Sequence, residues 1–135
     1  MPARLLTRPA ATTVPLLALL YCGQALAQER WAAIVPNQEN NATVVWATTK
    51  EQAKKLAVLA CKQVSQTCAE TPASTNGMDH VFAIMCCTDP KSACAAGVGA
   101  NRDKALKAVK SVLSDAGYAK CSLKSYFKAG TGEKG

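Results

Sequence analysis

The order strand, strand, helix, strand occurs twice along the chain, and this internal repeat leaves few folds open to it. In the first occurrence, residues 31–36 and 43–46 are apolar and β-branched runs that predict two strands. A helix follows them, and a further short strand is expected around Cys68, before a loop over residues 72–77. In the second occurrence the strands are expected at residues 81–86, 94–100 and 121–127.

Each repeat contains one amphipathic helix, with apolar residues at the spacing of a single helical face. In the first helix these residues are Ala53, Leu56, Ala57, Ala60, Cys61 and Val64. In the second helix they are Ala105, Ala108, Val109, Val112, Leu113 and Ala116. Ala53 and Ala105 are equivalent, 52 positions apart, so the two helices belong to units of about 50 residues.

The ends of both helices have typical capping residues. Thr48 or Thr49 can cap the first helix, and Asn101 or Asp103 can open the second. Gly117 follows the second helix at the position where a left-handed glycine often ends a helix. These signals predict an α+β fold of two pseudo-repeated β-β-α-β units, residues 30–75 and 80–127, with the helices packed on antiparallel sheet.

The first 27 residues have the pattern of a cleaved export signal. Arg4 and Arg8 precede a short apolar run over residues 14–21, and an Ala-Leu-Ala site ends at Ala27. The apolar run is too short to span a bilayer. Cys22 leaves a lipoprotein alternative open, although the bulky residue before it fits a lipobox poorly. We therefore expect a periplasmic or secreted single domain over residues 28–128, followed by a flexible tail over 129–135.

Cleavage at Ala27 would leave six cysteines: Cys61, Cys68, Cys86, Cys87, Cys94 and Cys121. An even number of cysteines in an exported chain predicts a set of disulfides. Cys61 and Cys68 have the same spacing as Cys87 and Cys94, so each of these pairs could close a small loop. The adjacent cysteines at 86 and 87 point to opposite faces of a strand and should bond to different partners. We expect the pairs Cys61–Cys68, Cys87–Cys94 and Cys86–Cys121.

These residues resemble the exported bacterial family called "domain of unknown function 4189". The matching segments are the aromatic-Ala-Ala-Ile start at 31–34, the Ala-rich helix that ends at Cys61, the following Cys68, and their second occurrence over 94–99 and 105–121. The second helix has Leu113 where the first has Cys61, which departs from the usual cysteine pattern. The resemblance implies an exported, cysteine-containing protein and brings no assigned activity.

Motifs for catalysis, cofactors or metals are weak in this sequence. There is no Cys-x-x-Cys spacing for a thiol oxidoreductase, and His80 is the one histidine, beside Asp79 in an expected turn. Gly97-Val98-Gly99 lacks the third glycine of a dinucleotide fingerprint, because Arg102 stands there. We interpret these glycines as a strand bulge or a close backbone contact. We expect no cofactor, no metal site and no enzymatic activity.

The remaining signal is positive charge. The chain has a net charge of +7, and cleavage at Ala27 would leave 14 basic and nine acidic residues, or +5. The candidate face for an anionic partner consists of Lys104, Lys107, Lys110, Lys120 and Lys124. We predict a monomeric, non-enzymatic domain that binds a protein, as an inhibitor or immunity-type partner in the cell envelope. The first alternative is a domain that binds lipopolysaccharide or peptidoglycan. The second alternative is a thiol-redox enzyme or another enzyme. Binding to nucleic acid is not expected in that compartment.

Overall fold

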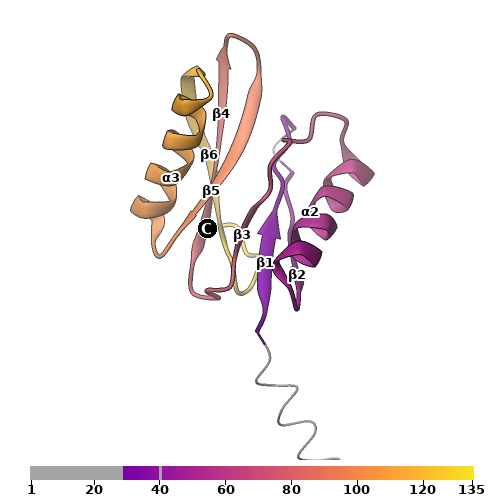
Figure 1. Ribbon diagram of the computed structural model, residues 1–135. Coiled ribbons are helices and arrows are strands. Elements are labelled where there is room, and N and C mark those ends of the chain that lie inside the picture. Colours follow the sequence, from indigo (N-terminus) through magenta and orange to yellow (C-terminus); the bar gives the residue numbers. More distant parts are fainter. Residues whose placement is uncertain (1–28, 40) are drawn as a thin grey trace, which may run out of the picture.

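The computed structural model describes residues 29–39 and 41–135, so the expected signal at residues 1–27 lies outside the described residues. The first unit contains β1 (Trp31–Ile34), β2 (Val44–Ala47), α2 (Lys50–Val64) and β3 (Ala73–Thr75). The second contains β4 (Val81–Asp89), β5 (Ala93–Gly99), α3 (Arg102–Asp115) and β6 (Ala119–Lys128). Figure 1 shows the two units side by side.

Both units have the same sheet topology. The strand orders are β2-β1-β3 and β5-β4-β6, and all pairs are antiparallel. In each unit the first strand is central, the second flanks it on one side, and the strand after the helix flanks it on the other. The predicted α+β fold of two β-β-α-β units is therefore confirmed.

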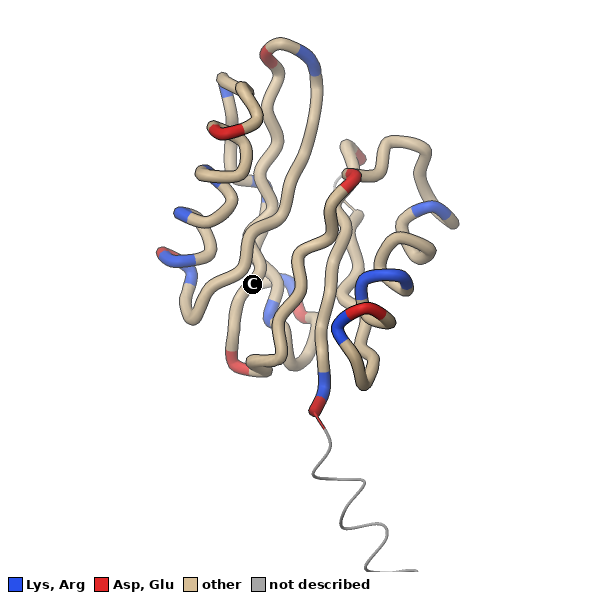
Figure 2. The backbone as a smooth tube through the Cα atoms, viewed as in Figure 1, with Lys and Arg blue, Asp and Glu red and all other residues tan. Residues whose placement is uncertain are grey.

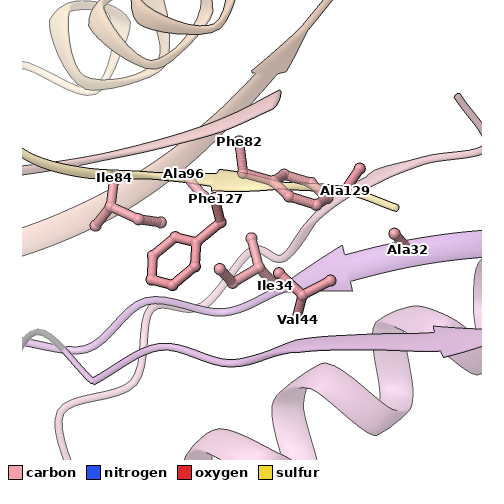
Figure 3. Close-up of a cluster of buried hydrophobic side chains, with 8 residues drawn as sticks. All are labelled: Ala32, Ile34, Val44, Phe82, Ile84, Ala96, Phe127 and Ala129. Carbon is pink, nitrogen blue, oxygen red and sulfur yellow. The ribbon is translucent and has the colours of Figure 1, made fainter. Parts of the chain in front are cut away.

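The two sheets lie face to face, and each is covered on its outer face by its own helix, α2 on one side and α3 on the other (Figure 1). The core between the sheets is formed by Ala32, Ile34, Val44, Phe82, Ile84, Ala96, Phe127 and Ala129 (Figure 3). Phe82 and Ile34 are among the largest fully buried side chains of the described residues. Two further cores lie between each sheet and its helix. The chain thus folds as four layers, helix, sheet, sheet and helix.

The helices bury a narrower stripe than the sequence pattern predicts. Only Ala53, Ala57 and Cys61 are buried in α2, and only Ala105, Val109 and Leu113 in α3. These are equivalent positions, one per turn, and Cys61 and Leu113 occupy the same place in the two units. The predicted burial of Leu56, Val64 and Val112 is wrong, since these side chains are 44%, 62% and 49% exposed. A small-residue helix sits so close to a narrow three-stranded sheet that only its central row meets the sheet.

The expected helix caps are present. Thr49 Oγ1 accepts a hydrogen bond from the backbone N–H of Gln52, and Asn101 Oδ1 accepts one from that of Lys104. Gly117 has φ of +86°, and the next residue, Tyr118, donates its N–H to the carbonyl of Leu113. This arrangement is the glycine-terminated helix end that the sequence predicts.

Two local predictions are wrong. No strand forms around Cys68, and β3 instead lies within the segment expected to be a loop, where Thr75 pairs with Ala32 of β1. The segment 129–135, expected to be a flexible tail, folds back on β6: Ala129 is fully buried and Lys134 bridges to Phe127. Long-range contacts hold both segments: β3 pairs with β1, and the N–H of Ala129 donates to the carbonyl of His80. The local sequence pattern does not encode such contacts.

Candidate functional site

All six expected cysteines form disulfides, and the pairing differs in part from the prediction. Cys61–Cys68 is confirmed, whereas the other two bonds are Cys86–Cys94 and Cys87–Cys121. The expectation that neighbouring cysteines on one strand have different partners holds, but those partners are exchanged. The expected pairs Cys87–Cys94 and Cys86–Cys121 are therefore wrong.

The register of the second sheet explains this pairing. Cys86 lies directly opposite Cys94 on β5, and Cys87 lies directly opposite Cys121 on β6. Their Cα atoms are 4.0 and 3.9 Å apart. Directly opposite residues in antiparallel strands come closest where they do not exchange hydrogen bonds, at about 4.5 Å against about 5.5 Å for bonded pairs. Such pairs alternate along a strand, so consecutive cysteines on β4 tie it first to one neighbour and then to the other.

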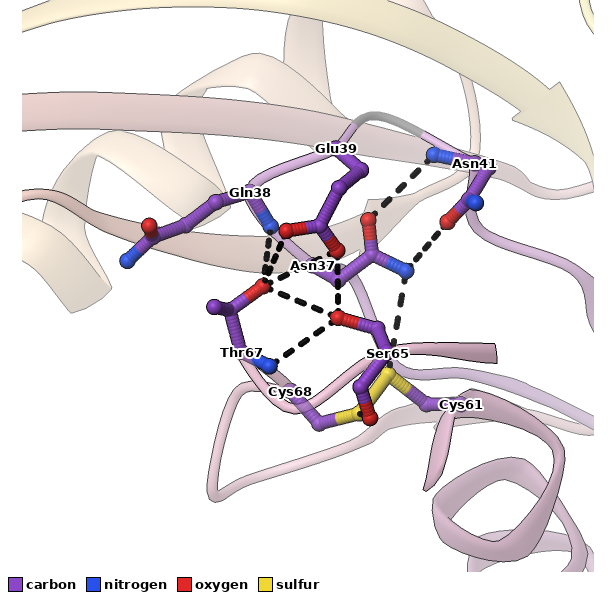
Figure 4. The surroundings of a disulfide bond; sticks show 8 residues. All are labelled: Asn37, Gln38, Glu39, Asn41, Cys61, Ser65, Thr67 and Cys68. Atoms are coloured by element: carbon purple, nitrogen blue, oxygen red, sulfur yellow. Dashed lines mark hydrogen bonds between the residues drawn. A yellow bond between two sulfur atoms is a disulfide. The ribbon is translucent and has the colours of Figure 1, made fainter. Parts of the chain in front are cut away.

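The disulfide of the first unit adjoins a polar network (Figure 4). The carboxylate of Glu39 accepts hydrogen bonds from the hydroxyls of Ser65 and Thr67, and the Oγ1 of Thr67 lies 3.0 Å from Oε2 of Glu39. The bonds from Ser65 and then Thr67 lower the pKa of Glu39 below its ordinary value. Beside them, buried Asn37 donates to Sγ of Cys61 at 3.8 Å. This network holds the loop after α2 against the loop after β1.

A groove of about 930 Å³ runs along β5. Its floor includes residues 93–98, one wall is the loop over residues 66–73, and the other is the end of α3 with Val112, Ala116 and Tyr118. The volume lies within the range of about 300–1,000 Å³ that is usual for ligand sites. Glu70 and Lys91 are the two charged residues among those that line it. Small apolar side chains dominate the floor, so the groove suits an apolar, extended ligand.

The glycines of β5 allow this strand to approach α3. A Cβ atom on Gly97 would lie 2.4 Å from the backbone nitrogen of Val109, and one on Gly99 would lie 2.6 Å from that of Ala105. Of the two interpretations left open, close backbone contact is therefore the correct one for these glycines. They pack β5, which forms the floor of the groove, closely against α3.

The five lysines of the candidate face are all exposed. Three of them lie on α3, and Lys120 and Lys124 lie on β6, at the edge of the same sheet. Figure 2 shows basic residues along α3. The charge is unevenly divided: residues 81–135 hold nine basic and four acidic residues, a net charge of +5, whereas residues 29–80 hold five of each. The excess positive charge thus belongs to the second unit, which also supplies most of the groove.

His80 contacts the neighbouring residues Thr75 and Gly77. Its Nδ1 lies 2.7 Å from Oγ1 of Thr75, and its ring packs over Gly77. Within residues 29–39 and 41–135, no group of three or more His, Cys, Asp or Glu side chains is arranged to hold a metal ion. In the same described part of the chain, no helix has the length and apolar character needed to cross a bilayer.

Sequence reasoning did not find the groove. Its walls come from the loop after α2 and from the end of α3, and even their nearest residues, Ala73 and Val112, are 39 positions apart in the chain. The only available signal was the uncharged run from Ser92 to Ala100, which predicts a strand but not what flanks it. No protein-family model, curated protein or solved structure matches this chain.

Proposed function

We propose that this protein is an exported, non-enzymatic domain that binds another protein in the cell envelope through its second unit. The observation that carries the proposal is the groove along β5, an apolar cleft formed mostly by the second unit, whose residues 81–135 have a net charge of +5. Apolar surface supplies affinity in such interfaces, and complementary charge speeds and orients the encounter. A partner with an acidic surface around an apolar segment fits both properties.

The compartment follows from the cysteines. Three disulfides in a domain of this size indicate an oxidising, extracytoplasmic location. We further propose that export depends on the signal at residues 1–27, with cleavage near Ala27, and that the chain belongs to the domain of unknown function 4189 family that it resembles.

A rigid scaffold supports an inhibitor or immunity-type role. Two disulfides join the central strand β4 to both neighbours, and the third closes the end of α2 onto the following loop. Rigid surfaces lose little conformational entropy on association, which favours tight binding from a small area. An inhibitor of an envelope enzyme or a toxin needs this property and needs no catalytic groups of its own.

Binding to an anionic envelope polymer is the second candidate. The exposed lysines of α3 and β6 favour it, because a repeated basic surface attracts lipopolysaccharide or peptidoglycan without a shaped pocket. Salt distinguishes the two candidates. Binding carried by lysines should collapse as ionic strength rises, whereas a packed protein interface should largely survive.

The decisive experiment is affinity capture from a periplasmic extract, at low and at high salt. The purified mature protein is compared with the triple variant Lys104→Glu, Lys107→Glu, Lys110→Glu. We expect one protein partner to be retained at high salt, with slower association to the variant and an unchanged melting temperature. Capture of polymer alone, lost at high salt and in the variant, would favour the second candidate. If neither protein nor polymer is retained, the proposed binding function is wrong.

An enzymatic thiol role is tested separately. All six cysteines from Cys61 to Cys121 are oxidised in pairs, so a redox role would require at least one pair to be reduced readily. We expect the native protein to resist thiol labelling under a mild glutathione buffer and not to reduce insulin. Rapid labelling of a single cysteine pair would support the redox alternative instead.

A further inference from the structure

The two edges of the second sheet differ in how they are protected. The β6 edge carries Lys120, Lys124 and Lys128, and a register shift interrupts its pairing with β4. Charges and bulges of this kind keep an edge strand from pairing with other chains. The opposite edge, β5, has seven residues without charge, proline or register shift. Only one side of this sheet is therefore defended against an added strand.

The Cys86–Cys94 disulfide shows which backbone groups of β5 point away from β4. The Cα distance of 4.0 Å between Cys86 and Cys94 places them in a pair that does not exchange hydrogen bonds. Because bonded and non-bonded pairs alternate, Cys94, Ala96 and Val98 direct their N–H and C=O groups away from β4. In residues 29–39 and 41–135, no backbone hydrogen bond outside the strand ladders reaches these three residues, and β5 pairs with β4 alone. Six main-chain groups thus face the groove.

The walls of the groove select what can reach this edge. The loop over 66–73 stands on one side and the end of α3 on the other, so β5 lies between two barriers. A second copy would bring a second loop and a second α3 with its own β5, so four walls rather than two would have to fit beside the paired strands. A single extended segment has no such walls. The geometry therefore favours a peptide segment over self-association.

We propose that the free edge of β5 binds an extended segment of the partner protein as an additional strand of the second sheet. This inference rests on the proposed protein-binding function and names its site and mode. Main-chain hydrogen bonds to Cys94, Ala96 and Val98 would supply register, as in other cases of strand addition. Side chains on both faces of the added strand would meet a wall, so its centre should be small and uncharged.

Charge complementarity defines the ends of the segment. The second unit has a net charge of +5, and Lys91 lies at the hairpin end of the groove, before β5 begins. Glu70 on the opposite wall is the one acidic residue among those that line the groove. Acidic residues on either side of the small uncharged centre would therefore be attracted by the unit as a whole. The ligand is an extended Ala-, Ser-, Thr- or Val-rich segment flanked by Asp or Glu.

The direct test uses a pool of synthetic peptides with central Ala, Ser, Thr and Val between paired aspartates, added to the folded, oxidised mature domain. Amide exchange is followed residue by residue by NMR. We expect binding to protect the amides of Cys94, Ala96 and Val98 and to leave those of Ala95 and Gly97 unchanged, since these already bond to β4. The best peptide should lose binding when alternate amides on one of its edges are N-methylated, but not on the other. Absence of binding, or protection confined to the α3 lysines, would overturn the inference.

Two variants and a matched control test the site without relying on one substitution. Ala96→Pro removes an outward N–H, a change that an edge strand tolerates, and should weaken peptide binding by about tenfold or more. Val112→Arg places a long side chain on the helical wall and should block the groove while β5 stays intact. Leu59→Arg adds the same charge at a similarly exposed apolar site on α2, outside the groove, and should leave binding unchanged.

The outcomes separate the inference from the function it rests on. If the captured envelope partner still binds both groove variants but not the lysine variant, the domain is a protein binder and strand addition is wrong. If the wild type captures no partner, the proposed function fails irrespective of the peptides. If the wild type sediments as a dimer and Ala96→Pro as a monomer, the occupant of the edge is a second copy and the peptide proposal is overturned.

Discussion

Leu113 and Leu56 both lie on the predicted apolar faces of their helices, but only Leu113 is buried in the structure. Leu113 is 3% exposed and packs against the second sheet in the last turns of α3. Leu56 is 44% exposed on the outer side of α2. Replacing each by alanine removes the same three carbon atoms. The difference in the free energy of unfolding between the two variants therefore measures the burial of the site rather than the chemistry of the side chain.

The expected losses follow from that burial. Three carbons at ~0.8 kcal/mol each give about 2.4 kcal/mol for Leu113, and the cavity left behind extends the range to about 2–5 kcal/mol. For Leu56 the buried fraction is 56%, so the transfer energy is about 1.3 kcal/mol. Solvent fills the space left by Leu56, so no cavity energy is added. Leu113→Ala should exceed Leu56→Ala by at least about 1 kcal/mol.

Urea unfolding of the oxidised protein measures both values, with tryptophan fluorescence and circular dichroism as independent probes. The two probes should report the same midpoint if unfolding is two-state. Equal losses in the two variants, or a larger loss for Leu56→Ala, would refute the four-layer packing of α3 and α2 described above. A changed slope of unfolding in either variant would indicate an effect on the denatured state instead.

Three further predictions follow from the disulfides, the glycines and the acidic network. Peptide mapping of the oxidised protein should find the disulfides Cys86–Cys94 and Cys87–Cys121. Replacing both cysteines by alanine should lower the free energy of unfolding by roughly 4 kcal/mol for Cys87–Cys121, which spans 34 positions, and by roughly 2.5 kcal/mol for Cys86–Cys94, which spans 8. Any crossed pair, such as Cys87–Cys94, would contradict the register of β4. Gly97→Ala should lower stability by about 3 kcal/mol, because the backbone of α3 blocks the added methyl group. At Gly117 an added methyl group has no neighbour within 4 Å, but φ is +86°, so Gly117→Ala should lose only about 1 kcal/mol to backbone strain. Thermal unfolding of the two variants measures this difference. Hydrogen bonds hold the pKa of Glu39 in the folded state below its ordinary value of 4.5. The contribution of Glu39 to stability is therefore present above that pH and is lost as the pH falls through the lowered pKa. Glu39→Gln should make stability less dependent on pH in the acid range, and an unchanged dependence would argue against the network.

Much of the fold follows from local sequence. The spacing of the alanines predicts both helices, Thr49 and Asn101 predict their starts, and Gly117 predicts an end in the left-handed conformation. The offset of 52 positions between Ala53 and Ala105 predicts that the helices have equivalent places in two like units, which the common strand order confirms. These features depend on contacts within a few residues along the chain, so a single sequence contains them.

The local sequence does not show which strands lie next to each other in the sheets. The alternation of side chains on a strand predicts that Cys86 and Cys87 face opposite ways, but it does not say which neighbouring strand lies on which side. That order decides the disulfides, the exposed edge at β5 and the groove beside it. It also decides that β3 forms where a loop was expected and that residues 129–135 fold back.

The local pattern by itself thus determined both helices, five of the six strands, their order and the set of oxidised cysteines. The tertiary structure decided which elements touch: it left Leu56 and Val112 exposed, buried Ala129, and placed Cys94 rather than Cys121 opposite Cys86. The physical reason is that periodicity and capping arise from neighbouring residues, whereas strand pairing and burial depend on how distant segments share one core. In this chain the candidate binding site lies between such distant segments, and so only the folded structure contains it.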